Sequence, residues 1–206
     1  RSLVVTGVQT CALPILSERP VFGSKFETDL WIQANKSTNQ KDGGKAVLDL
    51  VNKAVSRGGT MHSAVLCELI DRVAEVSAPG WQSAVARLTA LKRPEDTRPV
   101  LKAASMLAIH GFTAEAQKYL DGIQGGADLP MYHLVRGEVE AASGKKAEAV
   151  SDLKASQKSD PLNPHVYLLL AELEPSVDWS SVEACERMSR GMDYLDPSEG
   201  RNTPVG

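Results

Sequence analysis

The sequence has few aromatic residues, few cysteines and no long apolar run. Aromatics make up 5% of its 206 residues, so its core has to be built from Ala, Leu, Val and Ile, which favours close helix packing over a β-sandwich. Its three cysteines are too few and too scattered for a disulfide framework, and they favour a reducing compartment such as the cytoplasm. No apolar stretch approaches the roughly 18 residues that a membrane-spanning helix needs. We therefore expect neither a membrane partner nor a disulfide-stapled domain.

Motifs of catalysis and cofactor binding are missing as well. The chain has no Walker A run, no Gly-x-Ser-x-Gly elbow, no His-Glu-x-x-His and no Cys-x-x-Cys. Its net charge of −3 gives no general attraction to nucleic acid. The histidines are far apart in sequence, and only His133 and His165 fall near the starts of corresponding helices, the first helices of two successive predicted helix pairs. These absences predict a protein that is not an enzyme, with no cofactor, no metal site and no nucleic-acid partner.

The first residues resemble a technical sequence rather than natural protein. Residues 5–15 are similar to the conceptual translation of a sequencing adapter. The alternatives are a short strand or the apolar part of a signal peptide, for which Thr6, Gln9 and Thr10 are too polar. Residues 1–23 are therefore treated as an adapter-like, irregular segment and left out of the fold prediction.

Apolar residues recur with a helical period in the next part of the chain. Between Ala46 and Val55 they lie about one turn apart, which places them on one face of a helix. The pair Gly58-Gly59 is predicted to end this helix. Thr60 is predicted to cap the helix that follows.

Residues 24–97 are predicted as a helical region. It begins with a short helix through residues 26–34, followed by a polar linker over residues 35–44. No stretch in this region alternates apolar and polar residues in the way a strand requires. Whether its helices are degenerate copies of the repeats described next is left open.

From residue 98 onward the chain repeats itself. Four small or apolar residues recur at the same interval: Ala104, Gly111, Ala116 and Leu120 recur as Gly137, Gly144, Ala149 and Leu153. A period of about 34 residues with two helices per unit is typical of tetratricopeptide repeats. Residues 98–197 resemble about three such repeats, and residues 198–206 form a tail. The resemblance implies an all-α fold, an α-solenoid of antiparallel helix pairs with the superhelical form of tetratricopeptide proteins.

The middle repeat carries the best match to this family. Gly137 stands where the neighbouring helix approaches closely, Gly144 marks the turn, and Ala149 is the small residue of the second helix. The match is loose elsewhere. Val100 replaces the family's large aromatic in the first repeat, and Cys185 replaces an alanine in the third, which also has an insertion near residues 174–178.

The resemblance also implies a binding surface. In such arrays the first helix of each pair lines a concave groove that accepts an extended peptide. The predicted groove residues are Leu101, Ser105, Leu134, Glu138, Leu168 and Glu172. They lack the Asn and the Lys or Arg with which some family members hold a C-terminal carboxylate. An apolar row beside carboxylates predicts a partner with apolar anchors and a basic residue.

The predicted function is a protein–protein interaction scaffold or adaptor that binds a partner peptide or helix in this groove. The alternative is an accessory or regulatory repeat region of a larger enzyme or transcription regulator that is truncated upstream. Self-association is a third hypothesis, since a solenoid needs polar surfaces at its ends and no capping helix is evident after residue 197.

Overall fold

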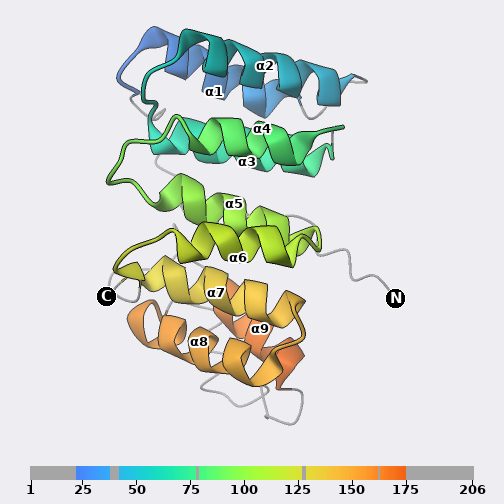
Figure 1. The fold of residues 1–206 in the computed structure, drawn as a ribbon, viewed down its shortest axis with the longest axis vertical. Helices are drawn as coiled ribbons and strands as arrows, with labels where there is room; N and C mark the ends of the chain where they lie inside the picture. Colours follow the sequence, from blue (N-terminus) through green and yellow to red (C-terminus); the bar gives the residue numbers. More distant parts are fainter. Residues whose placement is uncertain (1–21, 38–41, 78, 127–128, 162, 175–206) are drawn as a thin grey trace, which may run out of the picture. The chain divides into compact units, whose positions relative to one another are not determined.

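The computed structural model describes residues 22–37, 42–77, 79–126, 129–161 and 163–174 (Figure 1). Within these ranges all regular elements are helices. Their bounds are α1 Lys25–Ser37, α2 Gly43–Arg57, α3 Ser63–Glu75, α4 Trp81–Thr89, α5 Arg98–Ile109, α6 Thr113–Asp121, α7 Pro130–Ala142, α8 Lys146–Ser159 and α9 Pro164–Leu173. None of these helices is both long enough and apolar enough to span a bilayer. The all-α prediction is confirmed.

The helices divide into two compact units. Helices α1 to α6 form an N-terminal unit that ends at Gly126, and helices α7 to α9 belong to a C-terminal unit that begins after it. This division lies inside the segment 98–197, for which three repeats were predicted. Helices α5 and α6 therefore pack with the helices that precede them, and the repeat boundaries themselves stay a prediction.

The N-terminal unit is built from three helix pairs. Helix α1 packs on α2, α3 on α4 and α5 on α6, and the first helices contact one another in the order α1, α3, α5. The amphipathic pattern predicted between Ala46 and Val55 forms α2, whose Val47, Val51 and Ala54 are fully buried. Burying such side chains stabilises the unit by about 25 cal/mol for each Å² of apolar surface removed from water.

The predicted linker over residues 35–44 is helical at both ends, so its bounds were wrong. Helix α1 continues to Ser37, whose hydroxyl donates to the carbonyl of Gln33 over 2.7 Å. Helix α2 already begins at Gly43, and the Ala46 amide donates to the Asp42 carbonyl over 3.1 Å. These side-chain and backbone bonds extend both helices into the segment whose polar composition predicts a linker.

Thr60 does not cap α3. The Met61 amide donates to the Leu91 carbonyl over 2.8 Å, and the His62 amide donates to Glu27 Oε1 over 2.8 Å. These two bonds hold the backbone extended through His62, so the helix starts two residues later than predicted. His62 itself is the N-cap, because its Nδ1 accepts from the Ala64 amide over 3.2 Å.

The C-terminal unit is a hairpin of α7 and α8 with α9 packed mainly on α8. Its apolar core consists of Leu134, Leu153, Val166 and Leu170. Gly137 meets α8 so closely that a Cβ atom there would lie 2.8 Å from Leu153 Cγ. Gly144 turns the chain with φ +78°. Both predicted small-residue roles are confirmed, whereas Cys185, the insertion after residue 174 and the rest of the third predicted repeat lie outside the described residues.

Candidate functional site

The six predicted groove residues differ in how far they are exposed to solvent. Four of them are buried: Leu101, Ser105, Leu134 and Glu138. Leu168 is 48% exposed, and Glu172, one helical turn further along α9, is exposed as well. Since α5 belongs to the other unit, only Leu168 and Glu172 form an exposed pair on one described helix. Peptide binding by the six residues stays a prediction.

Leu134 and Glu138 on α7 both contact side chains of α9. Leu134 is part of the apolar core of the C-terminal unit. Glu138 Oε1 lies 2.7 Å from His165 Nε2 on α9, and both side chains are largely withdrawn from solvent. Glu138 is thus buried and already partnered by an imidazole of the same chain, and its role in peptide binding stays a prediction.

A polar cluster joins α7 to α8. Buried Asp152 on α8 lies 2.9 Å from His133 Nδ1 through Oδ1 and accepts from Arg136 Nε through Oδ2. The same Arg136 Nε lies 3.5 Å from Glu140 Oε1. Glu140 Oε2 is buried and has no hydrogen-bond partner within the described part of the chain. Two carboxylates from facing helices therefore share one guanidinium.

The surroundings of Glu140 and Asp152 shift the pKa values of their carboxyl groups in opposite directions. Burial, together with the neighbouring Asp152, raises the pKa of Glu140 to about 7. Burial also opposes ionisation of Asp152, but the hydrogen bonds from Arg136 and His133 outweigh it and lower the pKa of Asp152. The two groups titrate as a coupled pair. At neutral pH Asp152 is ionised, whereas Glu140 is divided between its two protonation states.

A second polar network joins α1 to α3 in the N-terminal unit. Arg72 on α3 donates to Asn35 Oδ1 on α1 over 3.3 Å, to Glu68 over 2.7 Å and to Glu75 over 2.8 Å. Burial raises the pKa of Glu68 against the opposing effect of Arg72. For Arg72, burial works against the charge, but Glu68 and Glu75 outweigh it and raise its pKa. The network links α1 to α3, and within it the charge of Arg72 is paired with Glu68 and Glu75.

Helices α3 and α5 are connected by an ion pair. Lys102 Nζ lies 2.5 Å from Asp71 Oδ1. The lysine side chain is only 3% exposed and the aspartate side chain 27%. Burial raises the pKa of Asp71, and the ammonium of Lys102 limits this rise.

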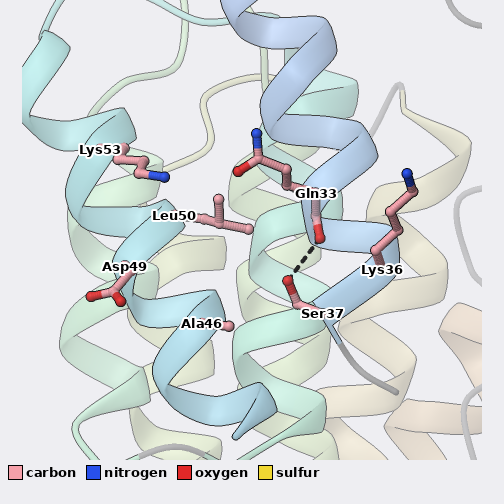
Figure 2. A pocket seen from close by; sticks show the side chains of 7 residues that line it. All are labelled: Gln33, Lys36, Ser37, Ala46, Asp49, Leu50 and Lys53. Atoms are coloured by element: carbon pink, nitrogen blue, oxygen red, sulfur yellow. Dashed lines mark hydrogen bonds between the residues drawn. The ribbon is translucent and has the colours of Figure 1, made fainter. Parts of the chain in front are cut away.

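An open pocket lies between α1 and α2 (Figure 2). Its lining residues are Gln33, Lys36, Ser37, Ala46, Asp49, Leu50 and Lys53. The Ser37 hydroxyl is engaged with Gln33 of its own helix. Lys36, Asp49 and Lys53 are exposed, so their charges are screened by water. This lining brings no nucleophile together with a base and offers no specific chemistry.

The histidines each have a local role. The His110 ring packs against Trp81 in a tilted arrangement with ring centroids 4.9 Å apart, and burial lowers the pKa of His110. His133 and His165 contact separate carboxylates, Asp152 and Glu138. Among the residues that the structure describes, no group of three or more His, Cys, Asp or Glu side chains is arranged to hold a metal ion.

The sequence analysis did not predict the polar cluster between α7 and α8, although the spacing of its α7 residues is visible in the sequence. His133, Arg136 and Glu140 are spaced three and four residues apart, which places them on one helical face. Asp152 shares no such pattern with them. Its position depends on the register of α8 against α7, which Gly137 and Leu153 determine.

Of the comparisons with known proteins, that with solved structures found a match, and it concerns the fold alone. No protein-family model matches the chain, and no curated protein matches it. A solved structure described as "MamA RS-1 ArsTM double mutant" superposes with a TM-score of 0.51 at 10% identity, over 86% of this chain and 98% of that chain. MamA is a protein with tetratricopeptide repeats. The chain accordingly has an all-α helical-repeat fold like that of tetratricopeptide proteins.

Proposed function

We propose that this chain is a protein-interaction scaffold, and that α9 carries a surface that binds an apolar peptide or helix with a basic residue. The helical-repeat fold supports the proposal, because stacked helix pairs present extended faces on which partners bind.

The observation that carries the proposal is the composition of α9. Val166, Tyr167 and Leu170 are buried on one side of the helix, yet Leu168 on another side is half exposed. A helix that is apolar all round is normally covered on every side. Glu172 follows Leu168 by one turn, so the apolar side chain and the carboxylate are neighbours on the helix surface.

The test is binding of labelled peptides to the full chain, measured by fluorescence anisotropy. The peptides carry one leucine anchor, with or without an arginine one helical turn away. We expect Leu168→Ala to raise the Kd for both peptides by about tenfold, equal to about 1.4 kcal/mol. Glu172→Gln should weaken binding of the arginine peptide only, because it removes the charge and leaves the apolar contact in place.

Matched controls come from the N-terminal unit. Ile109 is the other large apolar side chain that is exposed among the described residues, at 54%. Glu115 is an exposed carboxylate on α6. Ile109→Ala and Glu115→Gln should leave both Kd values unchanged. If the α9 variants bind as tightly as the parent, or if the control variants lose as much, the α9 surface is not the binding site.

The alternative role, as an accessory or regulatory region of a larger enzyme or transcription regulator, uses the same kind of surface. Sequencing the source DNA upstream of residue 16 distinguishes the two. A reading frame that enters a catalytic or DNA-binding motif favours the accessory role. Light scattering of the purified chain tests self-association separately, since a second copy is itself a partner of the required apolar chemistry.

A further inference from the structure

We propose that Glu140 and Asp152 share one proton across the contact between α7 and α8, and that loss of this proton weakens the C-terminal unit. The proposal makes this hairpin a pH-responsive element. It is independent of the partner-binding role proposed above, because it concerns residues between α7 and α8 rather than the exposed Leu168 and Glu172 on α9.

The geometry supports one shared proton. Asp152 is already contacted by His133 and Arg136, so its ionised form has two donors. Glu140 has a longer 3.5 Å contact with Arg136 Nε and a side-chain hydrogen bond with Asp152. Its Oε2 is buried, and no described residue donates a hydrogen bond to it. A buried, ionised oxygen without a donor is costly. The proton therefore stays on Glu140 above the pH at which an ordinary glutamate loses it, and leaves as the pH approaches about 7.

The other charged groups around the pair do not relieve this cost. Helix α8 adds the carboxylate of Glu148, which acts against ionisation of Glu140. On the α9 side, His165 is engaged with Glu138. The cation of Lys154 is engaged with Glu174 at 3.0 Å. Arg136 is thus the cation that the structure places beside both carboxyl groups.

The direction of the pH effect follows from the raised pKa of Glu140, about 7 in the folded chain against 4.5 for an ordinary glutamate. The folded state then holds the proton more tightly than the unfolded state does. Its stabilising effect is complete below pH 4.5 and is lost as the pH rises to about 7. Asp152 has the opposite shift, and its contribution is lost only in acid, below the pKa of an ordinary aspartate.

The first test is a pH titration of the full chain labelled with ¹³C at the glutamate carboxyl carbons. We expect one resonance, absent from Glu140→Gln, to titrate near pH 7, well above the other glutamates. If the Glu140 resonance titrates near 4.5, the two groups do not share a proton and the proposal is wrong. This result needs only the parent chain to be folded across the range, and Glu140→Asp supplies the assignment if the Gln variant does not fold.

The second test is urea unfolding followed between pH 5 and pH 8. The folded-to-unfolded ratio of the parent should fall, relative to that of Glu140→Gln, by up to about two orders of magnitude over this range. Glu172→Gln on α9 is the matched control and should follow the parent. Parallel curves for the parent and Glu140→Gln would show that Glu140 ionises as readily when folded as when unfolded, which overturns the proposal.

Discussion

Lys102 and Asp71 form an ion pair in which the cation is the more deeply buried partner. Their charged atoms lie 2.5 Å apart between α5 and α3, with the lysine side chain 3% exposed and the aspartate 27%. Burying an ammonium group costs free energy that only a close counter-charge offsets. The pair therefore holds the third helix pair of the N-terminal unit against the second, and its two halves are not equivalent.

This asymmetry predicts unequal losses on mutation. Asp71→Asn removes the nearest counter-charge of a buried ammonium, and we expect it to lower the free energy of unfolding by about 3 kcal/mol. Lys102→Met keeps the apolar stem and leaves a carboxylate that still reaches water, so its cost should be about 1 kcal/mol or less. Urea unfolding at pH 7 measures both. Equal losses would mean that the burial of Lys102 does not set the energetics.

Gly137→Ala should destabilise the C-terminal unit. The added Cβ would lie 2.8 Å from Leu153 Cγ and 3.3 Å from the Ala149 carbonyl. Overpacking costs about 1–3 kcal/mol, and the better helix propensity of alanine returns up to about 1 kcal/mol. We expect a net loss of about 1–2 kcal/mol by thermal or urea unfolding.

Two further variants isolate the clash at Gly137. In a Leu153→Ala background, Gly137→Ala should cost little or become stabilising, because the opposing side chain is gone. Gly122→Ala is the control, since a Cβ at that position meets only ordinary contacts, the nearest at 3.5 Å. If Gly137→Ala lowers the free energy of unfolding equally in both backgrounds, the destabilisation comes from the backbone rather than from the contact with Leu153.

The carboxylate of Glu27 on α1 accepts a hydrogen bond from the backbone at the start of α3. It is buried, and its Oε1 accepts from the His62 amide over 2.8 Å. Glu27→Ala leaves this amide without its acceptor, and we expect a loss of about 2 kcal/mol. Glu27→Gln keeps an acceptor oxygen and should retain more than half of the stability. Amide hydrogen exchange at His62 should quicken in the Ala variant first; unchanged exchange there would contradict this role.

We expect the contribution of Asp96 to the stability of the fold to be lost in acid. Its Oδ1 accepts from the Arg98 amide over 3.1 Å at the start of α5. Burial acts against its charge, but the bonds from Arg98 outweigh it and hold the pKa of Asp96 below 3.8. Its contribution is therefore present above pH 3.8 and is lost as the pH falls below that value. Asp96→Asn should be less stable than the parent by about 1 kcal/mol at pH 7, and the difference should shrink below pH 4.

The sequence was sufficient for features that depend on local chemistry. The spacing of apolar residues between Ala46 and Val55 predicted α2, and Gly58 ends it at φ +67°. The interval between Ala104 and Gly137 pointed to a close helix approach that the contact with Leu153 confirms. These predictions needed only the helical period and the size of a side chain.

Features set by distant partners were not predictable from one sequence. Thr60 has the right chemistry for a cap, yet Leu91 and Glu27 bind the backbone just after it and delay the helix. Glu138 has a charged side chain of the kind usually found at a protein surface, yet His165 lies against it. In both cases the deciding contact joins residues about thirty positions apart, and nothing in the local pattern marks it.

The close approach at Gly137 also limits the order in which this protein can change through evolution. Every amino acid other than glycine carries a Cβ, so each single substitution at position 137 meets Leu153. A lineage in which position 153 has first become smaller is free to replace the glycine, whereas a lineage that retains leucine is not. Two positions that are sixteen residues apart thus accumulate mutations in a fixed sequence, with the change on α8 preceding the change on α7.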